Sequence, residues 1–433
     1  MKRMWKAISV WTICLVACAV VCLTLGCVRK AKQEVEINIE ETPSVRYEVD
    51  VTLLLKENKL VGEETIYYTV PFEGCESIGL WSQANIVSAH IEYSELHREQ
   101  GDVYTFLMLP SALSKGEKVA IQVQFAAECK ETEKGLSATD YIPLVSEYIG
   151  EYLCPTPSEY GEYRAVERGE VDMRLIAPKQ LVIAANGEMK TREYEGETQT
   201  LRLAFSANEH IALAASPYYI RKSATVGETT WEYYATTVDQ LKWQSIQAIA
   251  QNAYALWGDC NAKRVCLIEG CDIDIAGLAG IRGRTIAEIK EKVAAQWGKM
   301  TGEAWIAASI EEYVKWVYDE QYDNETADKR LNEAKDNVTI YTLVHKGEDQ
   351  RMDRPIDTYD KEGYDALLVD KGLLFWVNLH EIAGDVVGDC VHTLASINHV
   401  DTSTLLAVLK EITGKDYTYF VVAWVEGKAV YAR

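Results

Sequence analysis

The sequence predicts an α+β protein in which an N-terminal antiparallel β-sandwich precedes a mainly α-helical domain. Two patterns support this class. From Tyr47 to Leu55 every second residue is apolar, as in a strand that is buried on one face. In the second half Ile286, Ile289 and Val293 instead repeat at helical spacing. With 433 residues the chain is long enough for two or three domains, each with a core of its own.

The predicted domain boundaries follow the change in pattern. Residues 45–224 form the β domain, and 225–433 form the helical domain, which opens with a strand at 227–236. A helix is expected from Thr237 to Trp257, with a capping box of Thr237 and Gln240 at its start and Gly258 at its end. A later helix is expected at Tyr364–Ala383. Strands of the β domain are expected at Thr65–Val70, Val103–Leu109, Val119–Phe125, Val171–Pro178, Val182–Gly187, Leu201–Phe205 and His210–Tyr219.

The charge balance restricts the classes of partner. The chain has 66 acidic and 44 basic residues, which give a formal net charge of −22. A surface this acidic repels phosphate groups, so neither a nucleic acid nor an anionic lipid surface is expected as the main partner.

The N-terminus predicts a location outside the cytoplasm. Residues 1–27 have a basic start, an apolar run from Ile8 to Leu25 and then Gly26 and Cys27, as in a secretory leader. The ending resembles a bacterial lipobox, so Cys27 is the predicted site of lipidation, and 28–44 reads as a linker. The alternative is an uncleaved membrane anchor from about Trp5 to Val28. Either way the body is attached to the cell membrane and faces outward.

Seven cysteines remain after the leader, an odd number that cannot pair completely. None has the C-x-x-C spacing of a metal site. We expect buried free thiols, with one or two disulfides as the alternative. The seven are Cys75, Cys129, Cys154, Cys260, Cys266, Cys271 and Cys390.

The stretch from Thr285 to Tyr313 predicts two helices, the first opened by a capping box of Thr285 and Glu288. Within it Ala295-Gln296-Trp297-Gly298, followed by Trp305-Ile306 and Tyr313, resembles the membrane alanyl aminopeptidase family (aminopeptidase N type, gluzincin). That family reads H-E-x-x-H-Q-W-x-G and then W-L-x-E-G-x-A-x-Y. The resemblance implies a thermolysin-like second domain, a zinc ion held by two His and a Glu, and a catalytic Glu between the two His. The same resemblance implies closing helices at Thr402–Gly414 and Asp416–Trp424.

This chain departs from the family pattern at each of those four positions. Glu291 and Ala295 stand in the places of the two His, Lys292 in that of the catalytic Glu, and Ala308 in that of the ligand Glu. A methyl group has no lone pair to donate, and a charged Lys cannot act as a base. The alternative is an ordinary solvated helix face, on which Glu288 and Lys292 form a favourable i,i+4 pair.

Two further family positions are also changed. The family's substrate-binding edge strand carries a G-x-M-E-N motif whose Glu binds the free amine of the substrate. The resemblance places this strand at Gly277-Leu278-Ala279-Gly280, the predicted substrate-binding residues, with Gly280 in the place of the Glu. Val369, before Lys371-Gly372, replaces the Tyr that stabilises the oxyanion in the family.

The functional expectation is therefore a non-catalytic lipoprotein of the aminopeptidase family that has no cofactor and binds a peptide or protein. Two alternatives stay open. One is an active zinc aminopeptidase with other ligands, for which His380 and Glu381 are the candidates. The other is a structural or accessory subunit of a membrane complex, such as a transporter.

Overall fold

A computed structural model describes the chain from residue 45 onward. The described residues are 45–101, 104–149, 152–153, 166–167, 169–206, 210–237, 239–283, 285–397 and 399–427. They belong to one compact unit, Pro43–Arg433, so the predicted boundary at residue 224 stays a prediction. The predicted leader, Cys27 and the linker lie outside the described residues. Within the described ranges, no helix has the length and apolar character needed to cross a membrane.

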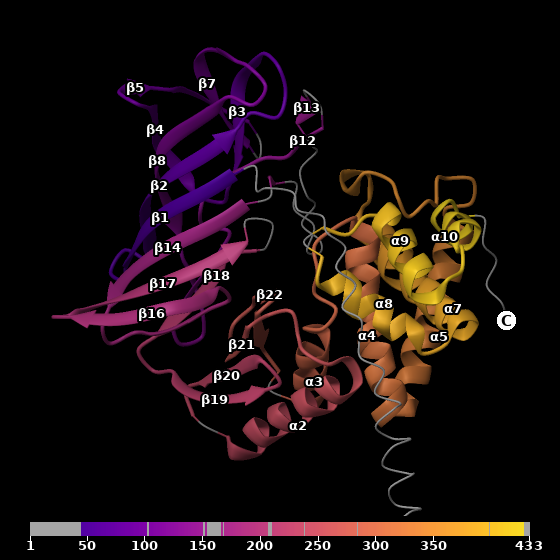
Figure 1. Ribbon diagram of the computed structural model, residues 1–433. Coiled ribbons are helices and arrows are strands. Elements are labelled where there is room, and N and C mark those ends of the chain that lie inside the picture. Colours follow the sequence, from indigo (N-terminus) through magenta and orange to yellow (C-terminus); the bar gives the residue numbers. More distant parts are fainter. Residues whose placement is uncertain are drawn as a thin grey trace, which may run out of the picture. The chain divides into compact units, whose positions relative to one another are not determined.

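A mixed sheet forms the main layer of the N-terminal part (Figure 1). Its strands are antiparallel to their neighbours except β1 and β14, which run parallel from the pair Val45 and Gly169 onward. In sheet order the strands are β16 (Glu188–Glu195), β17 (Thr198–Ser206), β14 (Gly169–Pro178), β1 (Val45–Leu54), β2 (Lys59–Thr69), β8 (Lys118–Glu128), β4 (Asn85–Ile91) and β5 (Ser94–Glu95).

Smaller sheets supply the second layer. One has the order β15 (Val182–Ala185), β18 (Ala212–Ser216), β10 (Leu136–Thr139) and β9 (Lys130–Glu131). Another has the order β11 (Leu144–Val145), β3 (Cys75–Trp81), β7 (Tyr104–Leu113) and β6 (His97–Gln100). A hairpin pairs β12 (Tyr148–Ile149) with β13 (Tyr152–Leu153).

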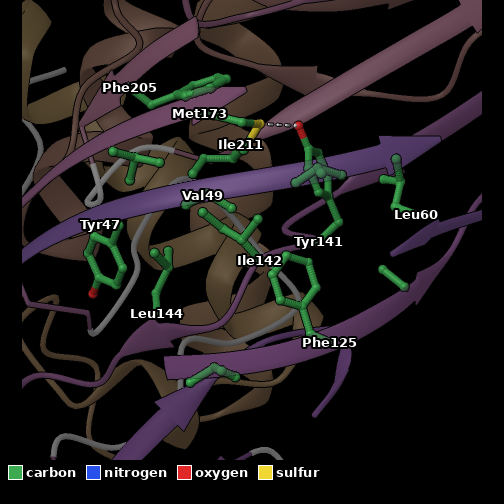
Figure 2. Close-up of a cluster of buried hydrophobic side chains, with 14 of the residues drawn as sticks. Tyr47, Val49, Leu60, Phe125, Tyr141, Ile142, Leu144, Met173, Phe205 and Ile211 are labelled. Carbon is green, nitrogen blue, oxygen red and sulfur yellow. Dashed lines mark hydrogen bonds between the residues drawn. The ribbon is translucent and has the colours of Figure 1, made fainter. Parts of the chain in front are cut away.

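The core of this part lies between the two layers (Figure 2). Along β1 the burial alternates as the sequence predicts, because successive side chains of a strand point to opposite faces. Tyr47 is fully buried, and its hydroxyl accepts a hydrogen bond of 2.8 Å from the Val145 amide of the opposite layer. Tyr141 likewise donates to Met173 Sδ at 3.4 Å. The two layers thus share one apolar core, in which the hydroxyls of Tyr47 and Tyr141 are hydrogen-bonded.

A further sheet, of five strands, leads into the helical part. Its order is β19 (Ile220–Val226), β20 (Thr229–Ala235), β21 (Arg264–Glu269), β23 (Leu278–Ile281) and β22 (Asp274–Ile275). Between β20 and β21 the chain forms α2 (Gln240–Trp257), which ends at Gly258 as predicted. Its N-cap is Asp239, whose carboxylate accepts from the amides of Leu241 and Lys242. The predicted capping box of Thr237 and Gln240 is therefore wrong, because Asp239 caps the helix instead.

The helices that follow form the C-terminal half (Figure 1). The predicted helix Tyr364–Ala383 is present, but its first part, η2 (Tyr364–Asp370), is a π-helix, and only the second part, α7 (Lys371–Ala383), is α-helical. The others are α3 (Ile286–Ala295), α4 (Ala304–Tyr322), α5 (Asn324–Val344), η1 (Ile356–Thr358), α6 (Lys361–Gly363), α8 (Val386–Ala395), α9 (Thr402–Thr413) and α10 (Thr418–Val425).

The cysteines in the described ranges are buried free thiols, as predicted; they are Cys75, Cys129, Cys260, Cys266, Cys271 and Cys390. Cys154 lies outside the described residues.

Candidate functional site

Helix α3 carries the first three changed positions. Its N-cap is Thr285, whose hydroxyl accepts from the Glu288 amide at 3.1 Å, as predicted. Glu288 does not complete the capping box, since its carboxylate accepts from the Arg282 amide instead. Ile289 and Val293 are fully buried, which fixes the rotation of the helix and leaves the neighbouring charged residues free to face the helices around it.

Arg330 of α5 occupies the centre of a cluster of carboxylates. Its guanidinium bonds to Glu291 of α3, lies 2.8 Å from Glu312 Oε2 and lies 3.0 Å from Asp319 Oδ2, both of α4. The Arg330 side chain is 17% exposed, and that of Asp319 is 2% exposed. Glu291 stands in the predicted place of the first metal-binding His. The positive charge that Glu291 binds is therefore the guanidinium of Arg330.

The cluster continues as a chain of ion pairs on both sides. Lys290 lies 2.8 Å from Asp319 and 2.9 Å from Asp323, which also caps α5. On the other side Lys315 bridges Glu312 and Glu311 of its own helix. Helices α3, α4 and α5 are therefore joined by alternating charges.

The series of ion pairs continues to Lys299, which follows α3. Lys299 Nζ lies 2.9 Å from Glu311 and 3.6 Å from Asp274, and its side chain is only 5% exposed. Burial by itself would raise the pKa of Glu311, but the adjacent Lys299 and Lys315 outweigh burial and lower it well below the usual range. Burial likewise lowers the pKa of Lys315, and Glu311 and Glu312 more than reverse that effect. The arrangement keeps these groups charged although they are removed from water.

Lys292, in the predicted place of the catalytic Glu, bonds to Asp274 of β22. The side chains are 28% and 35% exposed. As an ammonium bonded to a carboxylate, Lys292 has no lone pair with which to accept a proton from water.

The position of the edge strand differs from the prediction. Leu278–Ile281 is β23, an interior strand that pairs with β21 on one side and with β22 on the other. The edge strand is β22, and its Asp274 bonds to Lys292 of α3. Gly280 lies in the interior strand β23. A Cβ atom on Gly280 would lie 2.1 Å from the Cys271 carbonyl oxygen, which explains the glycine there. Strand β22 is not predictable from the sequence, because a strand of two residues is too short to show an alternating pattern.

The two alanines are placed on facing helices. Ala295 ends α3 and is 2% exposed. Ala308 is partly exposed on α4, one turn before Glu311 and Glu312, and α3 packs against α4. Neither methyl group offers an electron pair to a metal ion.

Val369 lies near the end of the π-helix η2, which packs against α4 and α5. The next residues are titratable and largely buried. Burial raises the pKa of Asp370 to about 6, although a hydrogen bond of 3.0 Å from Asn337 opposes the shift. Burial lowers the pKa of Lys371 to about 8, and its ammonium donates to the Gln350 carbonyl at 3.0 Å. A valine at this position offers no hydroxyl for an oxyanion.

His380 has a structural partner. Its Nδ1 lies 2.7 Å from the hydroxyl of the fully buried Tyr313, and its ring packs on those of Tyr313 and Trp316. Across the described ranges, no three His, Cys, Asp or Glu side chains are arranged to hold a metal ion. His380 and Glu381 are therefore not brought together with further metal ligands there.

A pocket of about 650 Å³ lies beside α3, and Gly277, Gln296 and Lys299 belong to its lining. The predicted substrate-binding residues do not all line this pocket. Gly277 reaches the pocket and its amide donates to Gln296 Oε1 at 2.9 Å, whereas Leu278 and Ala279 are fully buried in the sheet.

Sequence reasoning missed Arg330 and Asp274. Arg330 lies in α5, a strongly polar helix that was not predicted, although the Asp323 cap and the later Ala327, Ala334 and Val338 give it a readable helical pattern. That pattern locates the helix. It does not reveal that Arg330 reaches Glu291, 39 residues earlier.

Comparisons with known proteins add a fold relationship. No protein-family model matches the sequence, and no curated protein does. The structure is similar to an M1 zinc metallopeptidase from Deinococcus radiodurans, with a TM-score of 0.59 and 17% identity over 90% of this chain and 95% of that one. A mutant of it bound to a Tyr-Ser-Ala substrate gives 0.59 and 16% over 89% and 95%.

A two-domain M1 zinc metallopeptidase mutant bound to L-arginine gives a TM-score of 0.60 and 16% identity over 90% of this chain and 96% of that one. At such identities the likeness establishes the fold and no activity. The mixed α+β class predicted from the sequence is confirmed, and the fold is that of these metallopeptidases.

Proposed function

We propose that this protein is a non-catalytic relative of the M1 metallopeptidases that binds a peptide or a protein segment. The observation that carries the proposal is the pair of bonds Arg330–Glu291 and Lys292–Asp274. The first binds a guanidinium to Glu291, the residue that the resemblance aligns with a metal ligand, and the second bonds a carboxylate to Lys292, the residue that it aligns with the catalytic base.

Peptide binding is supported by the pocket next to α3, whose volume of about 650 Å³ is in the range of ligand sites. The protein is further proposed to be attached to the outer side of the cell membrane through its N-terminus, by lipidated Cys27 or by an uncleaved anchor, as the leader sequence suggests. No cofactor is proposed.

The test is metal analysis of the purified full chain, together with hydrolysis of aminoacyl-anilides and peptide binding. We expect less than about 0.1 zinc per chain after dialysis, no hydrolysis that a chelator abolishes, and saturable peptide binding, since a site with a Kd of 1 µM corresponds to about 8 kcal/mol. Stoichiometric zinc with chelator-sensitive cleavage would establish the active enzyme instead.

His380→Ala serves as the matched variant for that alternative. Zinc that binds the wild-type chain and is lost in His380→Ala would show that His380 is a ligand. No peptide binding, combined with co-purification of a membrane complex, would establish an accessory subunit.

A further inference from the structure

The pocket beside α3 has walls from both halves of the described chain. On one side are Glu170, Lys190 and Phe205, from strands β14, β16 and β17. On the other side are residues of the helical part, including Met300 and Ile397. Apolar side chains thus alternate with charged ones around a space of about 650 Å³. Such mixed walls suit a ligand with both charged and apolar parts.

The lining has exposed charges of both signs and two buried cations. The acidic residues Glu170, Asp172 and Glu188 are exposed, and so are the basic residues Arg46, Lys190 and Lys263. The basic side chains of Lys299 and Arg264, in contrast, are 5% and 7% exposed. Their carboxylate partners, Glu311, Asp274 and Glu232, are not part of the lining. The buried end of the pocket therefore presents hydrogen-bond donors in a chain that is otherwise acidic.

One donor group of Arg264 is not hydrogen-bonded among the described residues. Its Nη2 donates to the Ala185 carbonyl at 2.7 Å, and its Nε lies 3.2 Å from Glu232 Oε2. Its Nη1 is buried and has no hydrogen-bond partner among the described residues. A buried donor without an acceptor costs free energy, which a bound acceptor restores.

His210 is held in place at the same pocket. Its Nδ1 lies 2.7 Å from Oδ2 of the buried Asp140, and Asp140 Oδ1 also accepts from the Ile211 amide at 3.2 Å. The His210 carbonyl accepts from Asn186 Nδ2 at 2.6 Å. Within the described residues the ring is bonded through Nδ1 only, so Nε2 is the nitrogen that a ligand would meet. A carboxylate behind an imidazole orients the ring, and Nε2 donates to a ligand when the ring is an imidazolium.

We propose that the buried end of this pocket binds the C-terminal carboxylate of a peptide, with His210 and Arg264 as its donors. Charge-assisted hydrogen bonds from such groups to a carboxylate are the strong class. Phe205 and Met300, which belong to the same lining, would contact the side chains of a short peptide. This inference rests on the proposed function, because it names the part of the peptide that is recognised.

The test compares two forms of one ligand set on the full chain in detergent. An equimolar tripeptide library with free C-termini and the same library with C-terminal amides are equilibrated with the protein, and the bound fraction is measured by mass spectrometry. We expect the free acids to bind at least about tenfold more tightly, which is the effect of about 1.4 kcal/mol. Equal binding of both libraries would overturn this inference and leave the proposed function standing. Binding of neither would overturn the proposed function itself.

His210→Gln and His90→Gln are the matched variants. His90 is a partly exposed histidine of β4 that lines a different, outward-facing hollow of the sheet. We expect His210→Gln to lose the preference for the free acid and His90→Gln to keep it, with thermal unfolding as the check on folding. An unchanged preference in a folded His210→Gln protein contradicts the assignment.

Inorganic phosphate gives a measurement that needs no variant. As a competing anion it should displace the free acids from the wild-type chain without displacing weakly bound amides. If phosphate binds and the free acids do not, the site is a phosphate site and the carboxylate assignment is wrong.

Discussion

The Arg330 guanidinium and the Glu291 carboxylate bind each other across two helices that are separated by all of α4 in the sequence. Burial would lower the pKa of Arg330, yet Glu291, Glu312 and Asp319 together raise it. The cluster therefore contains a permanent cation that three carboxylates share.

Replacing this cation should cost much of the stability. In Arg330→Met the aliphatic stem remains but three carboxylates lose their shared partner, so we expect the free energy of unfolding to fall by about 3 kcal/mol. Urea denaturation measures it. Lys329→Met is the control, because Lys329 is 72% exposed and its pair with Glu333 spans 3.7 Å. A loss below about 0.5 kcal/mol is expected there. Equal losses in both variants would mean that the cluster is no more stabilising than a surface pair.

Reversing the charge at Lys292 tests the second bond. Lys292→Glu puts a carboxylate beside Asp274 and should lower the free energy of unfolding by about 1 kcal/mol more than Lys292→Met does. In the Lys292→Glu background, Asp274→Asn removes the repulsion, so the two changes together should cost less than the sum of the single ones. Additive losses would show that the two side chains do not interact in solution.

Glu64 is a buried acid without compensation. It lies on the core face of β2, is 3% exposed, and neither carboxylate oxygen has a hydrogen-bond partner among the described residues. Burial raises its pKa well above the usual range, so the folded state holds a proton that the unfolded state releases above a pH of about 4.3. Stability should therefore fall as pH rises from there towards the folded-state pKa.

Glu64→Met should remove this dependence and raise the free energy of unfolding at pH 7 by about 2 kcal/mol. Glu76→Met on the exposed side of β3 is the control and should leave both unchanged. Urea titrations at several pH values distinguish the two. If the Glu64→Met protein kept the wild-type slope against pH, another group would be responsible.

Gly372 allows close packing of α7 on α4. A Cβ atom there would lie 2.3 Å from Ser309 Cβ, and the Ser309 hydroxyl accepts a bond of 2.8 Å from Trp376 Nε1. Gly372→Ala should lower the free energy of unfolding by about 2 kcal/mol. Gly388→Ala in α8 meets nothing closer than 3.6 Å and should be neutral or stabilising by up to about 1 kcal/mol. Thermal unfolding compares them, and a Gly372→Ala protein as stable as the wild type would contradict this packing.

Local signals made much of the fold predictable. The alternation along β1, the Thr285 cap and the glycines after α2, α7 and α9 are each set by a few neighbouring residues. The site was less predictable because its partners come from distant segments. The resemblance to a family motif drew attention to Glu291 and Lys292, but no local pattern reveals that they meet Arg330 and Asp274.

The alternating charges that join α3, α4 and α5 also constrain how this arrangement can arise or be undone. Lys290, Lys299 and Lys315 each bind two carboxylates, so the loss of one acid leaves the cation with another partner. Arg330 is different, because three carboxylates share its guanidinium. Substitution is therefore least costly at the ends of the network and most costly at Arg330.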